Sequence, residues 1–262
     1  MRAEIIEKQT RAMRENGFDA IVSCSPENFA YVTGFVVPSQ PLIRHRHAAA
    51  IVTADGTKAL FGVDMEASTI RRKQPDVPTC IWAEFSDDPM VVLANQLSEL
   101  HLSSARIAIE MDYLPAGDLM RLQAALPAAT FVPAERVLAR LRQIKTPGEI
   151  ALLRKLSRIA DQAIYDALAS VEEGDSEMDI AGHLTRNVYA LGAEHFKLLI
   201  VATGERSVLP NVGPSDRVLK RGDVCRVEIF SVIDGYQAGV CRTAVVGEAP
   251  DHAKDIWSHL VD

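Results

Sequence analysis

A single carboxylate, Glu228, has the clearest potential for chemistry in this sequence. It lies in the stretch VEIFSVIDGYQAGVCRT, residues 227–243, where two apolar runs meet at Asp234-Gly235. That dipeptide is a strong signal for a two-residue β-hairpin turn. With this turn Glu228 faces Cys241, and Gly239 is its diagonal neighbour on the same face, roughly 7–8 Å away at the backbone. Two acids in these places could share a metal ion, but only one acid is present.

Three roles for Glu228 follow from its surroundings. Its neighbours Val227, Ile229 and Phe230 are apolar, and a partly desolvated carboxylate is a candidate for a functional site. It could also be one half of a metal site that has lost its partner, although a single carboxylate cannot hold a divalent cation at useful affinity. The third possibility is a structural acid paired with an arginine at a sheet edge.

The histidines give weaker signals. In RHRH, His45 and His47 alternate with Arg44 and Arg46, which suggests a metal clip. No cysteine or acid is near them in the sequence, so we expect solvent-facing strand residues instead. Two further histidines are expected to be structural helix residues, His183 and His195.

The four cysteines lie far apart in the sequence, mostly in apolar runs. Without paired spacing they are expected to be small buried hydrophobic residues in a reducing compartment. Cys241 could be a nucleophile, but no histidine is placed to activate it. We therefore expect a buried thiol there.

Composition is typical of a soluble globular enzyme. Of the 262 residues, 48% are hydrophobic and 24% are charged, and the formal net charge is −7. The acidic balance and scattered basic residues argue against nucleic-acid binding. No apolar run approaches the ~18 residues that span a bilayer, and the charged N-terminal helix lacks the apolar centre of a signal peptide. A cytoplasmic protein without a membrane partner is expected.

The elements that position these residues fall into two regions. Residues 1–143 alternate helix and strand patterns, which predicts an α/β domain with a mixed sheet. Strands are expected at 20–24, 48–53, 58–63, around Ile81 and at 107–110. Helices are expected at 3–16, 64–74, 89–100, 115–126 and 133–143, with a helical turn in PENFAYVTGF that ends at Gly34.

The second region begins after residue 143. Thr146, Pro147 and Glu149 have the pattern of an N-cap, a first helical position and a capping box. The pattern predicts a long helix to about residue 171, a second helix from Ser176 to about residue 190, and a strand near residues 197–203. A loop with two prolines, the hairpin and a final helix that begins near Pro250 follow.

Several motifs resemble the creatinase, prolidase and aminopeptidase P family. These are KTPGEIALLRKLSRIADQAIYDAL, LKRGDVCRVEIFSVIDGYQAGVCRTAVVG and, near the N-terminus, DAIVSCSPENFAYVTGF. The resemblance implies an N-terminal domain at residues 1–143 and the first half of a pita-bread catalytic domain at 144–262. The fold class is then α/β (α+β), and the second half of the catalytic domain is expected after residue 262.

The resemblance also implies site residues. Metal-dependent members carry two bridging aspartates at the positions of Glu228 and Gly239, and a substrate-contacting histidine at that of Asn211. The pair here therefore predicts that no metal cofactor is bound. The hairpin resembles metal-free members: creatinase has Phe at the Phe230 position and a substrate-binding Glu at that of Cys241, whereas ectoine hydrolases carry Glu at position 228. Creatinase also holds the substrate carboxylate with an N-domain arginine of the partner subunit, at positions that here are Arg46 and, on the same strand face, Arg44.

The expected function is a metal-independent, creatinase-like hydrolase. Its substrate would be a small carboxylate-bearing amide, guanidino or amidine compound, cleaved at a C–N bond within a homodimer. The catalytic residues would be Glu228 and Asn211, and the substrate-binding residues would be Arg46, Arg44, Phe230 and Cys241. Two alternatives stay open: a catalytically degenerate binding or scaffolding relative, and an Xaa-Pro metallopeptidase-like protein. The sequence does not identify the substrate.

Overall fold

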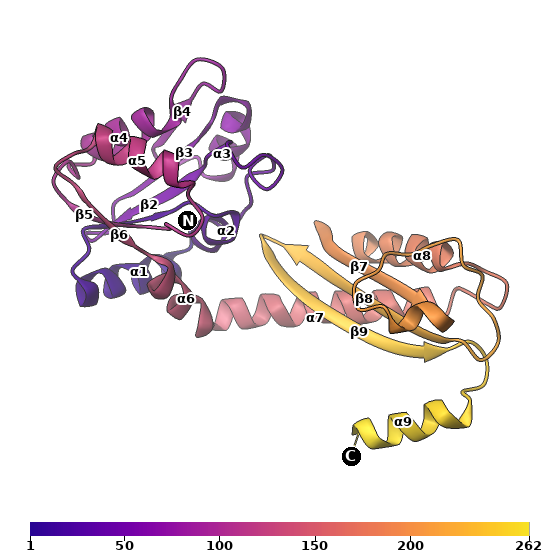
Figure 1. Cartoon of the computed structure of the whole chain (residues 1–262). Coiled ribbons are helices and arrows are strands. Elements are labelled where there is room, and N and C mark those ends of the chain that lie inside the picture. Colours follow the sequence, from indigo (N-terminus) through magenta and orange to yellow (C-terminus); the bar gives the residue numbers. More distant parts are fainter. Residues whose placement is uncertain (262) are drawn as a thin grey trace. The chain divides into compact units, whose positions relative to one another are not determined.

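The chain forms two compact units in the computed structural model, which describes residues 1–261. The first unit is Met1–Thr146 and the second starts at Pro147. The sequence predicts the boundary between the two domains after residue 143, three residues before the observed one. The first unit contains a six-stranded sheet and the second a three-stranded sheet, and both are labelled strand by strand in Figure 1.

The sheet of the first unit is mixed, as predicted. Its order is β4-β3-β2-β1-β5-β6. The central pairs β1/β2 and β2/β3 are antiparallel, whereas β3/β4, β1/β5 and β5/β6 are parallel. The strands are β1 (Ala20–Ser23), β2 (Ala49–Thr53), β3 (Lys58–Val63), β4 (Thr79–Trp82), β5 (Arg106–Ile109) and β6 (Thr130–Pro133).

Strand β6 was not predicted, because it is only four residues long and lies at the sheet edge. No residue of β6 is buried, so it lacks the apolar pattern that marks a strand. The helices of the unit match the expected regions. They are α1 (Ala3–Asn16), α2 (Pro26–Thr33), the 3₁₀ turn η1 (Asp64–Glu66), α3 (Ala67–Lys73), α4 (Pro89–Glu99), α5 (Ala116–Ala125) and α6 (Glu135–Gln143).

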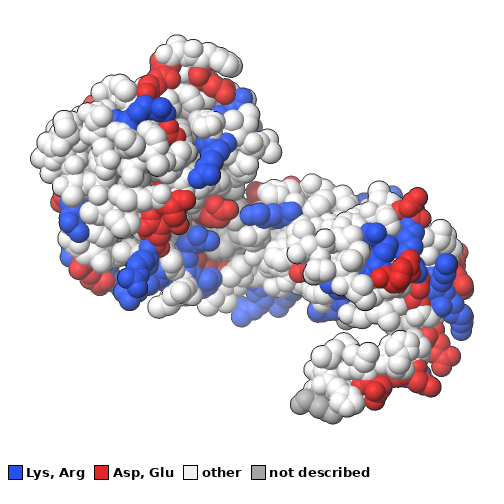
Figure 2. All heavy atoms as spheres, in the orientation of Figure 1, with Lys and Arg blue, Asp and Glu red and all other residues white. Residues whose placement is uncertain are grey.

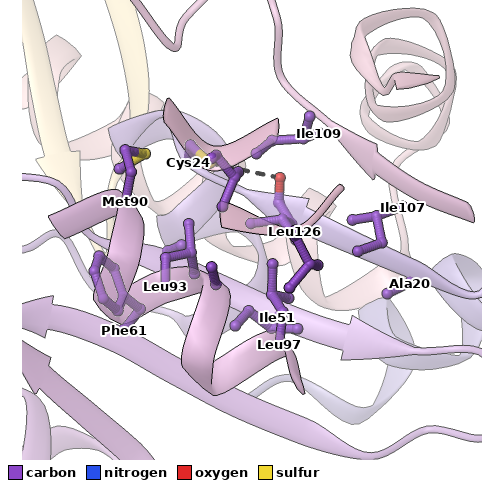
Figure 3. Packing of buried hydrophobic residues seen from close by; sticks show 14 of the residues in the cluster. Ala20, Cys24, Ile51, Phe61, Met90, Leu93, Leu97, Ile107, Ile109 and Leu126 are labelled. Atoms are coloured by element: carbon purple, nitrogen blue, oxygen red, sulfur yellow. Dashed lines mark hydrogen bonds between the residues drawn. The ribbon is translucent and has the colours of Figure 1, made fainter. Parts of the chain in front are cut away.

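The central strands of this sheet are buried on both faces. Every residue of β1 and β2 is buried, which is the pattern of strands covered by helices on both sides. Figure 3 shows how Ile51 and Phe61 from the strands meet Leu93 and Leu97 from α4 in one apolar cluster. One apolar cluster therefore extends over β1, β2, β3 and β5 on the face that α4 covers.

The second unit packs two helices on a three-stranded antiparallel sheet of order β7-β8-β9. Helices α7 and α8 cover one face of the sheet and form the core with it. The predicted cap of α8 is confirmed as a capping box between Ser176 and Asp179. The elements are α7 (Pro147–Leu168), α8 (Glu177–Ala190), β7 (His195–Thr203), η2 (Gly204–Val208), β8 (Val224–Ile233), β9 (Tyr236–Val245) and α9 (Asp251–Val261).

Surface charge is mixed in sign. In Figure 2 the basic and acidic side chains alternate over the visible face and form no broad basic area. Within residues 1–261, none of the helices combines the length and the apolar character that a bilayer crossing needs.

Candidate functional site

The hairpin has the register that the turn predicted. Asp234 and Gly235 have φ of 52° and 77°, the two positive values that a type I′ turn requires. Glu228 pairs with Cys241, and Phe230 pairs with Gly239. The geometry of the turn thus places these four residues on one face of the sheet.

Side chains along β8 alternate between a covered and an open face. Cys225, Val227 and Ile229 are buried against the helices, whereas Glu228 and Phe230 are half-buried on the other face. The carboxylate therefore belongs to the face of the sheet that α7 and α8 leave uncovered.

Glu228 lies at the centre of a row that crosses the sheet. Its partners are Ile200 on β7, which is buried, and Cys241 on β9. Cys241 is exposed, so the prediction of a buried thiol is wrong. Partial burial raises the pKa of the Cys241 thiol, and the negative charge of Glu228 raises it further. The thiol is thus protonated at neutral pH, which weakens it as a nucleophile.

The ring of Phe230 covers Gly239. A Cβ atom added to Gly239 would lie 2.5 Å from Cζ, 2.7 Å from Cε1 and 2.8 Å from Cε2 of the ring. An aromatic side chain that lies over a glycine on the neighbouring strand is a known way to cover the exposed backbone. Position 239 therefore has no room for a side chain unless Phe230 moves, and Glu228 has no acidic diagonal partner.

The loop after β7 is bonded to β8, the strand that carries Glu228. Arg226, two residues before Glu228 on the same face, donates from Nη2 to the carbonyl oxygens of Leu209 and Pro210, the latter at 2.8 Å. Asn211 follows directly and is exposed. The structure thus places Asn211 in a segment tied to the strand of Glu228.

A buried carboxylate, Glu177 at the start of α8, fastens this loop. It is 0% exposed and accepts hydrogen bonds from Thr203 N at 2.7 Å and Ser215 Oγ at 2.7 Å. Arg206 Nε lies 3.0 Å from its Oε2. Burial opposes the ionisation of Glu177, but the hydrogen bonds from Ser215 and Thr203 outweigh it and lower the pKa. Glu177 could not be predicted as an anchor, because its partners Thr203 and Ser215 lie 26 and 38 residues further along the chain.

Arg217 holds the end of the same loop. Its guanidinium donates to Glu205 at 2.9 Å and to Asp223 at 2.6 Å. The hydrogen bond from Arg217 lowers the pKa of Glu205 to about 2. Bidentate pairs of this kind fix geometry well, so both ends of the loop are anchored.

Arg44 and Arg46 were expected on one face of a strand, but neither residue lies on a strand. Both are in the irregular segment that precedes β2. Arg46 Nε lies 2.7 Å from Glu84 Oε1. Arg44 donates to the carbonyl oxygen of Tyr113 at 2.7 Å and lies over its ring. Both guanidinium groups therefore have partners within the first unit.

Two histidine predictions are corrected. His47 is only 5% exposed and its Nε2 lies 2.9 Å from Asp118 Oδ2, so it is not a solvent-facing strand residue. His195 is the first residue of β7 and not a helix residue. The partner of His47 could not be recognised, because Asp118 lies on α5, far along the sequence.

Comparisons with known proteins cover nearly the whole chain. Residues 6–144 match the Creatinase/Prolidase N-terminal domain and residues 151–262 match Metallopeptidase family M24. The Xaa-Pro dipeptidase of Pyrococcus furiosus is 25% identical over 99% of this chain and 69% of its own length. The uncharacterized peptidase YqhT of Bacillus subtilis is 26% identical over 98% of this chain and 69% of its own.

Solved structures show the same fold. The X-Pro aminopeptidase from Thermotoga maritima matches with a TM-score of 0.79 at 22% identity. The match covers 97% of this chain and 68% of the aminopeptidase chain. A dipeptidase from Pyrococcus horikoshii has a TM-score of 0.78 at 26% identity, with the same coverage.

These findings overturn two expectations. The second unit matches a metallopeptidase family, and relatives over the whole chain are named Xaa-Pro dipeptidase. The prediction of a metal-independent, creatinase-like hydrolase is therefore wrong. The prediction of no metal cofactor is also wrong for a chain of this family, and the structure holds a group of possible metal ligands, His45, His47 and Asp118. Glu228 and Gly239 therefore do not separate this chain from the metallopeptidase family.

Proposed function

The chain belongs to the creatinase and prolidase family, and we propose that it is part of a peptidase that cleaves dipeptides of the Xaa-Pro type. The observation that carries the proposal is the half-buried carboxylate of Glu228 on the open face of the second sheet. The similarity to Xaa-Pro dipeptidases over 99% of the chain supports this substrate class. The chain spans 69% of the length of these relatives. Dipeptidase activity is therefore something that we propose for this chain.

A metal ion fits the hairpin only in part. Glu228 offers a carboxylate, which is a suitable ligand for hard divalent cations. Gly239 offers no ligand atom, and the Phe230 ring fills the space beside it. The hairpin thus lacks a second carboxylate for a two-metal centre, and we derive no step through a metal ion.

The chain's own residues have three tasks in this proposal. Glu228 orients a water molecule or a substrate amide and takes up or holds a proton there, as a partly desolvated carboxylate can. The hydrogen bonds of Glu177 and Arg226 hold the loop that carries Asn211 in place. Asn211 supplies an amide that both donates and accepts hydrogen bonds, so it suits a substrate carbonyl or amine.

The proposal is tested by the substrate range of the purified protein. Xaa-Pro dipeptides and the matching Xaa-Ala dipeptides are assayed after reconstitution with Mn²⁺, Co²⁺ or Zn²⁺, alongside elemental analysis. We expect hydrolysis with a higher kcat/KM for the proline series. Absence of turnover with every dipeptide and metal would contradict the proposal. A dipeptide that raises Tm and is not cleaved would point to a binding protein.

A further inference from the structure

We propose that His45, His47 and Asp118 form a Zn²⁺ site in the first unit, separate from the hairpin. Their ligand atoms all lie within 4.8 Å of one another. The two histidines come from the turns before β2, and the aspartate comes from the first turn of α5. The site thus joins two segments that only the fold brings together.

The two buried members of the group point at a shared space. His47 is 5% exposed and Asp118 is 4% exposed. The His47 Nε2 atom lies 2.9 Å from Asp118 Oδ2, and no other group among residues 1–261 donates a hydrogen bond to this buried oxygen. A carboxylate oxygen can accept more than one partner, so a bound cation would occupy the acceptor capacity that His47 leaves.

A neighbouring arginine holds the carboxylate in place. Arg121 Nη2 donates to Asp118 Oδ1, the other oxygen of the same carboxylate. Ligand carboxylates in metal sites are commonly fixed by a hydrogen bond to their other oxygen. Arg121 is itself half exposed, with 54% of its side chain accessible, so water screens its charge from a cation at Oδ2.

The donor set selects the metal. Two imidazoles with one carboxylate suit Zn²⁺, whereas Mg²⁺ and Ca²⁺ require oxygen ligands. Zn²⁺ with three protein ligands keeps a fourth position for water. His45 is exposed, so that fourth position can be open to solvent.

The competing explanation is a simple buried ion pair. In that case His47 and Asp118 stabilise each other, and His45 is an unrelated surface residue. The two explanations differ in what His45 does. Its removal costs an ion pair nothing, but it takes away one of three ligands from a metal site.

The experiment counts Zn²⁺ per chain. The protein is stripped with a chelator, loaded with Zn²⁺, freed of excess metal by gel filtration and analysed by elemental mass spectrometry. We expect His45→Ala to bind about one equivalent less than the wild type. A matched control, His195→Ala at an exposed histidine of the second unit, should keep this equivalent.

Co²⁺ gives a readout that does not depend on activity. Loaded wild type should show the visible d–d absorption of a site with nitrogen and oxygen ligands, and His45→Ala should lose it. His45→Gln is the second variant, in case the alanine variant folds poorly. Equal Zn²⁺ content and equal Co²⁺ spectra in wild type and both His45 variants would overturn the site. Failure of dipeptide hydrolysis would not affect this result, because the two sites share no residue.

Discussion

The two sheets of the molecule differ in how their faces are covered. In the first unit, every residue of β1 and β2 is buried. In the second, β8 alternates between residues packed on helices and half-buried residues such as Glu228. A strand covered on both faces can offer chemistry only beyond its ends, which is where His47 lies. A strand with one open face can present a carboxylate from its middle.

The largest expected effect tests this difference in burial. In β2, Ile51 and Val52 are adjacent and both 0% exposed. Ile51→Ala should lower the free energy of unfolding by about 2–5 kcal/mol, and Val52→Ala should lower it as well. In β8, Ile229→Ala should have a similar cost, but Glu228→Ala next to it should change stability by less than about 1 kcal/mol. Denaturant unfolding of the four variants measures this, and equal costs at both positions of β8 would refute the one-sided arrangement.

The anchor of the loop gives the next largest effect. Glu177→Ala removes the acceptor for Thr203, Arg206 and Ser215. Leaving buried donors without a partner should cost about 3 kcal/mol. Amide hydrogen exchange should also become faster in residues 204–217. Unchanged exchange there would show that Glu177 does not hold the loop.

The same residue predicts a dependence on pH. The folded pKa of Glu177 is lowered from its ordinary 4.5, so the folded state binds fewer protons than the unfolded state near that pH. Its contribution to stability is therefore present above about pH 4.5 and is lost as pH falls through the lowered folded value. Urea midpoints of wild type and Glu177→Gln, measured between pH 3 and 7, should converge at the acidic end.

A smaller effect concerns the covered glycine of the open face. Gly239→Asp should lower the free energy of unfolding by about 1–3 kcal/mol, because its Cβ would meet the Phe230 ring. The double variant Phe230→Gly/Gly239→Asp should recover part of that loss and bind Mn²⁺ more tightly than the wild type, since two carboxylates then face each other diagonally. Calorimetric titration with Mn²⁺ checks the second expectation, and unchanged affinity would contradict it.

Local signals in the sequence were sufficient for much of the fold. The Asp234-Gly235 turn determined the register of the hairpin, and Ser176 marked the start of α8. These features depend on residues close together in the chain. Strand β6 escaped because its four residues show no apolar pattern.

The candidate sites were harder to predict, because they depend on contacts between distant segments. The acid next to His47 is on α5, and the partners of Glu177 lie on the loop after β7. The Phe230–Gly239 contact was within reach of the sequence, since the predicted register pairs the two residues. The prediction that no metal is bound failed for another reason. It rested on two positions, Glu228 and Gly239, whereas the similarity to metallopeptidases extends over nearly the whole chain.

The most direct test of the open face as the active site is the kcat/KM of Glu228→Gln for an Xaa-Pro dipeptide. Glu248→Gln, an exposed acid of the same unit, is the matched control. We expect a loss of about 100-fold or more in the kcat/KM of Glu228→Gln, with the Tm of this variant and the activity of the control unchanged. Wild-type kcat/KM in the Glu228→Gln variant would contradict it.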